Sequence, residues 1–149
     1  MADIQTFEKI KDIRDKEKRE KQLFHQEAVD IFERKAEQLY DALKKKETAV
    51  HEFNRKLSEK TVQAGSFIQH QNYIARLEKK IDSLQPAVQQ ARVKMQQSQS
   101  KLTEAHVEVK KYETLIENKY LKYQNWVKSE ENKHMDELSM QQYLNFQNR

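Results

Sequence analysis

The sequence has almost none of the residues that reverse a polypeptide chain: its 149 residues include one glycine, one proline and no cysteine. Domains with many loops average about 7% glycine and 5% proline, because turns depend on the backbone geometry of these residues. This chain therefore has the turn chemistry for only one or two reversals. The absence of cysteine excludes a disulfide framework and fits a cytosolic protein.

Long apolar runs are absent as well. No stretch approaches the roughly 20 consecutive apolar residues that a transmembrane helix needs, and the N-terminal sequence lacks the apolar region of a signal peptide. Charged residues make up 35% of the chain, and its 28 basic and 24 acidic residues leave a net charge of only +4. Interleaved charges of both signs are typical of solvated helix faces and disfavour a basic nucleic-acid-binding surface.

The sequence is instead rich in helix-forming residues, and its second half has a regular heptad pattern. Counting by sevens from Phe67 to Tyr123 gives nine consecutive apolar residues, which we assign to position a of a heptad. The residues at position d, such as Leu77 and Leu84, are also largely apolar. This pattern predicts a coiled-coil helix over about residues 67–130.

The first half has a shorter version of the same pattern, which predicts a helix over about residues 4–60. Its a positions are Val29, Ala36, Leu43, Val50 and Leu57, and its d positions are Phe32, Leu39, Lys46 and Phe53. The only glycine, Gly65, lies between the two patterns. We expect a turn at residues 61–66, in which Gly65 takes a positive φ and Ser66 caps the second helix.

Folding the chain back at this turn places the two patterns opposite each other, for example Leu43 opposite Leu84. The predicted fold class is therefore all-α: a long antiparallel coiled-coil hairpin of two helices, forming a single domain over residues 1–149. The alternative is one uninterrupted helix that dimerises in parallel. It would place Gly65, Thr61 and Val62 in the middle of a helix, where such residues are unfavourable.

The second helix extends beyond the start of the first in this pairing, so the tail at residues 131–149 has no partner. Apolar side chains continue from the open end into this tail, and they are the predicted partner-binding residues of the open end and tail: Trp126, Met135, Leu138, Tyr143 and Leu144. Because burial of such side chains is favourable, we expect them to bind another protein. In the alternative, the tail folds back over the N-terminal apolar residues as a cap.

The sequence contains no motif for catalysis, a cofactor or a metal. One glycine cannot build a phosphate-binding loop, and the five histidines are scattered without a second ligand at helical spacing. A two-helix coil also has no deep pocket in which the pKa of a carboxyl group could be shifted. We therefore expect a protein that is not an enzyme, with no small-molecule substrate and no nucleic-acid partner, whose function resides in its surfaces.

Three segments of the chain carry a family resemblance: FIQHQNYIARLEKKI, LTEAHVEVKKYE and HMDELSMQQYL. With a hairpin of this length, they resemble the FliJ family of flagellar export proteins over nearly the whole chain. The resemblance implies a cytoplasmic stalk or adaptor of the flagellar type III protein export apparatus, peripherally associated with the cell membrane at the flagellar base. It also implies partners: the export ATPase, the cytoplasmic part of the export gate membrane protein, and export chaperones.

Members of that family place a gate-binding surface on both helices near the turn. The positions that match it here are Gln38, Tyr73 and Leu77. On the first helix the chain departs from the apolar surface of the family at Ala42, Lys45 and Ala49. A generic cytosolic coiled-coil scaffold or chaperone is the alternative function, because a helical hairpin alone fits it equally well.

Overall fold

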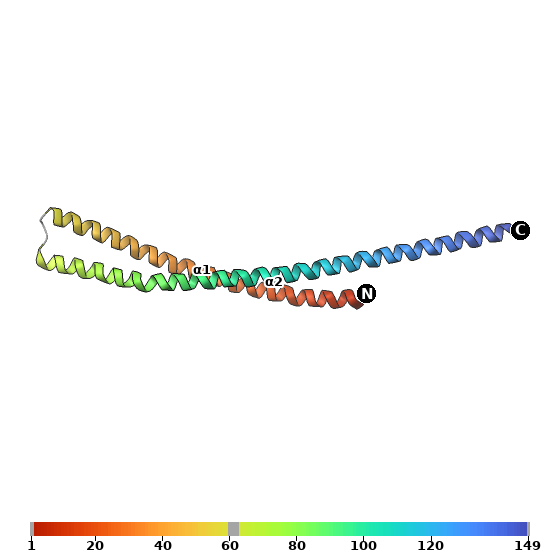
Figure 1. The fold of residues 1–149 in the computed structure, drawn as a ribbon, viewed down its shortest axis with the longest axis horizontal. Helices are drawn as coiled ribbons and strands as arrows, with labels where there is room; N and C mark the ends of the chain where they lie inside the picture. Colours follow the sequence, from red (N-terminus) through yellow and green to blue (C-terminus); the bar gives the residue numbers. More distant parts are fainter. Residues whose placement is uncertain (1, 60–62, 149) are drawn as a thin grey trace. The chain divides into compact units, whose positions relative to one another are not determined.

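The structure, a computed structural model, describes residues 2–59 and 63–148. These residues form two helices, α1 (Ala2–Ser58) and α2 (Ala64–Gln147), and no strand (Figure 1). The predicted all-α class is therefore confirmed. Residues 60–62, which include part of the predicted turn, lie outside the described residues.

The ends of α1 have charges that suit the helix dipole. Asp3 lies in the first turn, and Arg55 and Lys56 lie in the last, where cations stabilise the free carbonyl groups. The longer helix α2 continues through Pro86 without a break. Pro86 lacks an amide hydrogen, so the carbonyl of Asp82 loses its helical partner; both residues are exposed, and water can replace it.

The predicted role of Gly65 is wrong. Because α2 begins at Ala64, Gly65 lies in the first turn of the helix, its φ is not positive, and a Cβ atom there would meet nothing within 4 Å. Ser66 is also inside the helix, and the amide of Phe67 donates to the carbonyl of Gln63 at 2.9 Å. The helix therefore starts after Gln63 and not at the predicted cap Ser66. The glycine is tolerated there because the first turn is exposed.

The contacts within the chain define two units. The turn unit comprises residues 20–103, and the terminal unit comprises residues 1–19 and 104–149. In both units a segment of α1 packs against a segment of α2.

The helices of the turn unit are antiparallel. Close to the turn, the ring of Phe53 lies 5.1 Å from that of Phe67. Further along, Lys46 Nζ lies 3.6 Å from Glu78 Oε1. The residues therefore rise in number along α2 as they fall along α1, which confirms the predicted hairpin.

In the core of this unit, α2 contributes large residues from Leu77 to Val88 and small ones at Ala91 and Ser98, whereas the buried residues of α1 are small throughout. Six of the predicted a and d positions of α2 in this unit are buried, and the others are half-buried: the six are Leu77, Ile81, Leu84, Val88, Ala91 and Ser98. The buried residues of α1 in this unit are Ala28, Ala42 and Ala49.

The prediction for the a positions of α1 is partly wrong. Leu43 is 44% exposed, and Leu57 is similarly exposed, whereas Ala42 is only 2% exposed and packs with Ile81 and Leu84. The large residues of α2 leave room only for a small side chain on the facing helix. The face of α1 that turns towards α2 is therefore the one with Ala42. The predicted d positions of α1 remain half-buried.

The terminal unit has its own small core around Ile4 and Val109, both buried. The rings of Phe7 and Tyr112 lie 6.3 Å apart, and Lys119 Nζ lies 5.4 Å from the centre of the Phe7 ring. Lys119 also forms a salt bridge of 3.5 Å with Asp3. The pairing of α1 with α2 is thus antiparallel here as well.

Beyond these contacts, α2 continues past the start of α1 as a single helix (Figure 1). Every residue from 128 to 148 is exposed. The alternative in which the tail folds back as a cap is therefore wrong, and we call residues 126–147 the overhang.

Candidate partner-binding surfaces

The three residues predicted near the turn differ in exposure. Gln38 is exposed and Tyr73 is 40% exposed, whereas Leu77 is only 7% exposed. The structure therefore does not bring all three into one accessible patch. Leu77 supports the α2 backbone beside Tyr73 from within the core and offers little surface to a partner.

Tyr73 lies at a shallow groove between the two helices. The groove has a volume of about 360 Å³ and is lined on the α1 side by Lys45, Ala49 and Glu52, among others. The guanidinium of Arg76 lies 6.0 Å from the centre of the Tyr73 ring. Gln38 precedes Lys45 by one heptad and therefore lies on the same face of α1. An aromatic ring beside a mixed-charge groove is suited to binding another protein.

The five predicted residues of the overhang are all exposed, with exposed fractions between 41% and 62%. Met140 and Phe146, which are not among the predicted residues, are even more exposed than these five. Tyr123 and Trp126 form a ring pair with centres 6.2 Å apart where the overhang begins.

The apolar residues of the overhang do not share one face. At about 100° per residue along a helix, Met135 and Leu138 point to one side and Met140 and Leu144 to roughly the opposite side. A flat partner surface could cover only one of these sides. The overhang therefore suits a partner that encloses the helix.

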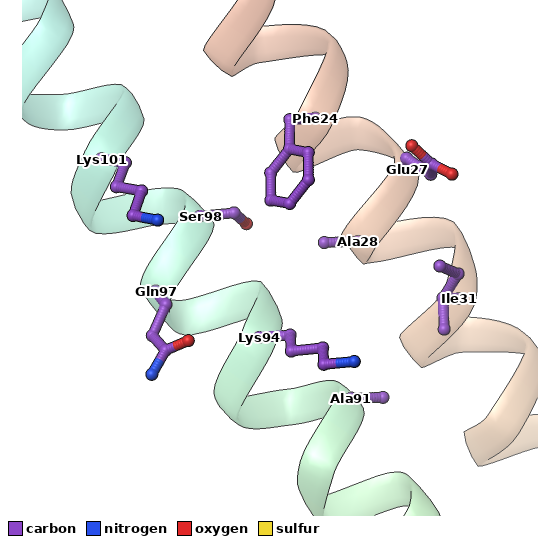
Figure 2. Close-up of a pocket in the computed structure, with 9 residues that line it drawn as sticks. All are labelled: Phe24, Glu27, Ala28, Ile31, Ala91, Lys94, Gln97, Ser98 and Lys101. Atoms are coloured by element: carbon purple, nitrogen blue, oxygen red, sulfur yellow. The ribbon is translucent and has the colours of Figure 1, made fainter.

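A second groove of the turn unit lies between Phe24 and Ile31 of α1 and Lys94 and Lys101 of α2 (Figure 2). Sequence reasoning did not predict this groove. The groove forms because small residues such as Ala28 do not fill the space between the helices. The hydropathy pattern of the sequence does not reveal it, because alanine has only a weak hydropathy signal. The long interval without carboxylates in α2, residues 83–103, could have identified it.

Arg14 and Glu17 form an ion pair one turn apart on α1, with 3.1 Å between Arg14 Nη1 and Glu17 Oε2. The Glu17 carboxylate accepts hydrogen bonds from Arg14 and raises the pKa of its guanidinium, which is charged at physiological pH in any case. Within residues 2–59 and 63–148, no group of three side chains could hold a metal ion. Over the same residues, neither helix is long and apolar enough to cross a membrane.

The sequence model of a known family, the flagellar FliJ protein, matches residues 4–148. The chain belongs to the FliJ family. The flagellar FliJ protein of Bacillus subtilis (strain 168) is 32% identical over 142 residues, which cover 93% of this chain and 93% of the relative. No solved structure matches the chain significantly. The resemblance inferred from three sequence segments is confirmed, and the FliJ match includes the overhang as well as the hairpin.

Proposed function

We propose that this FliJ-family protein serves in flagellar type III protein export as a cytoplasmic stalk and adaptor between the export ATPase and the export gate. The observation that carries the proposal is the overhang: a helix with large apolar side chains on several sides that no other described residue of the chain covers. The role requires no catalysis, and it places the protein at the inner face of the membrane.

The overhang is the proposed docking element for the ATPase. Each large apolar side chain contributes roughly 1.5–3 kcal/mol when it is fully buried. A ring of ATPase subunits can surround a helix and bury residues such as Met135 and Leu144 at the same time, which a single flat surface cannot. A ring-shaped partner therefore gains the most from this arrangement.

The proposed gate-binding surface lies near the turn and uses Tyr73 and Gln38. Tyr73 combines an exposed ring with a hydroxyl group, the kind of side chain that is enriched at the centre of interfaces. Leu77 is assigned a supporting role because it is buried. The adaptor is also proposed to bind export chaperones as further partners.

Two variants test the proposal, each serving as the control for the other. Truncation after Val127 removes most of the overhang, and Tyr73→Ala alters only the surface near the turn. Binding of each purified variant is measured to the export ATPase and to the cytoplasmic domain of the gate protein. The truncated chain should lose the ATPase and keep the gate, whereas Tyr73→Ala should keep the ATPase and weaken gate binding by about tenfold or more.

Far-ultraviolet circular dichroism should show that both variants remain helical, since neither change removes a core residue. A truncated chain that still binds the ATPase with full affinity would exclude the overhang as the docking element. Full gate binding by Tyr73→Ala would remove the surface near the turn from the proposal.

A further inference from the structure

The groove beside Phe24 is a third surface, separate from the overhang and from the groove at Tyr73. Its volume is about 410 Å³, and all of its lining residues belong to the turn unit. The floor contains Ala28, Ala91 and Ser98, whose small side chains leave the space between the helices unfilled. Phe24 stands at one edge with more than half of its surface exposed, and Ile31 lies two helical turns further along α1 (Figure 2).

The charge of this groove is uneven. From residue 83 to residue 103 α2 has no aspartate or glutamate, although the signs alternate closely elsewhere in the chain. Lys94 and Lys101 line the groove from this segment (Figure 2). Neither has a carboxylate within 4.0 Å among the described residues, so both ammonium groups are free to pair with a ligand.

We propose that this groove binds an amphipathic helix of a partner protein that has apolar residues on one side and carboxylates beside them. Phe24 and Ile31 are one heptad apart on α1, and Lys94 and Lys101 are one heptad apart on α2. A third helix with heptad periodicity can thus place apolar residues against the first pair and carboxylates against the second. Each repeat spans about 10.5 Å along the helix, which matches two helical turns of the ligand.

The form of the groove favours a helix over an extended peptide. The described part of the chain contains no strand edge to which an extended segment could add, whereas two helices present the ridges and grooves into which a third can pack. The groove lining contains one carboxylate, Glu27, and the two lysines, neither of which forms a salt bridge with a described residue. The excess of positive charge disfavours a basic helix and favours an acidic one. The ligand class is therefore an acidic amphipathic helix.

The test uses the full-length protein and two designed peptides of three heptads, each with leucine at positions a and d. One peptide has glutamate at positions e and g, and the other has lysine there; like charges keep both from pairing with themselves. Fluorescence anisotropy of the labelled peptides measures binding. The glutamate peptide should bind, and its affinity should fall as salt is added, while the lysine peptide should bind at least about tenfold more weakly.

Variants of the protein locate the site. Phe24→Ala should weaken the glutamate peptide by about tenfold, whereas the neighbouring exposed Leu23→Ala, which does not line the groove, should have no effect. Lys94→Glu/Lys101→Glu should reverse the preference, so that the lysine peptide now binds better. The control Lys79→Glu/Lys122→Glu makes the same change in net charge elsewhere on α2 and should not reverse it.

Three results would overturn the proposal. The first is the absence of binding by the glutamate peptide. The second is an unchanged preference for the glutamate peptide in Lys94→Glu/Lys101→Glu, because the proposal assigns that preference to these two lysines. Loss of folding would weaken both peptides and could not reverse the preference. The third is self-association of the full chain in sedimentation that Phe24→Ala abolishes, which would assign the groove to a second copy.

Discussion

Replacing Ile81 or Leu43 by alanine tests which residues form the core of the turn unit. Both changes remove three carbon atoms, but Ile81 is 5% exposed and Leu43 is 44% exposed. At about 0.8 kcal/mol per buried methylene, Ile81→Ala loses about 2.4 kcal/mol of transfer free energy, and the residual cavity brings the total to about 2–4 kcal/mol. The Leu43 side chain buries only a little more than half of its surface, so its replacement loses correspondingly less transfer free energy. Alanine also has the higher helix propensity, and we expect Leu43→Ala to destabilise the protein by about 1 kcal/mol.

Urea unfolding followed by far-ultraviolet circular dichroism measures both free energies, and unchanged slopes would allow the midpoints to be compared. A third variant, Ala42→Leu, adds volume where the side chain is 2% exposed and should destabilise the protein by about 1–3 kcal/mol. If Leu43→Ala were as costly as Ile81→Ala and Ala42→Leu were neutral, the core would contain Leu43, as the heptad pattern alone predicts. That result would refute the observed packing of α1.

Gly65→Ala should stabilise the protein by about 0.5–1 kcal/mol in the same assay, because the position is helical and a methyl group meets no atom there. A loss of stability would instead indicate a positive φ. Ser98→Ala should cost about 1–2 kcal/mol: the buried Ser98 hydroxyl donates to the Met95 carbonyl at 2.8 Å, so it accepts from His25 Nδ1 at 2.7 Å. Alanine leaves the His25 donor without this acceptor, whereas the Met95 carbonyl keeps its helical hydrogen bond within α2. Stability equal to the wild type would show that water replaces the hydroxyl. Truncation after Val127 should leave the unfolding midpoint nearly unchanged, since residues 128–148 are exposed; a large decrease would reveal a structural role for the overhang.

The packing of α2 could be predicted from the sequence almost residue by residue. Each a position from Phe67 to Ile116 is a large apolar residue, and all of them are buried or half-buried in the structure. For α1 the same reasoning selected Leu43 over Ala42, because the hydropathy of alanine is weak beside that of leucine. Which of two adjacent residues enters the core depends on the space that the facing helix leaves, and one helix does not contain that information.

The candidate surfaces show the same division. The overhang was predictable because it depends only on where apolar residues continue after the first helix has ended. The accessible residues near the turn were harder to predict. Leu77 matches the gate-binding surface of the family, but it also occupies position d of the heptad, and the structure buries it. The groove at Phe24 was missed because it is created by small side chains, which leave a space and no pattern of their own.

The hairpin has a further consequence for the order in which its contacts form. The Lys56–His70 contact near the turn joins residues 14 positions apart, whereas the Asp3–Lys119 contact of the terminal unit joins residues 116 positions apart. Closing the longer loop directly costs about 1.9 kcal/mol more chain entropy than closing the shorter one. Folding is therefore expected to nucleate at the turn and to proceed towards the termini, each new layer closing only a short additional loop. Unfolding should begin in the terminal unit, so the first contacts to open are those beside the overhang, such as Asp3–Lys119. A partner that binds the overhang can therefore separate α1 from α2 there while the contacts near the turn stay closed.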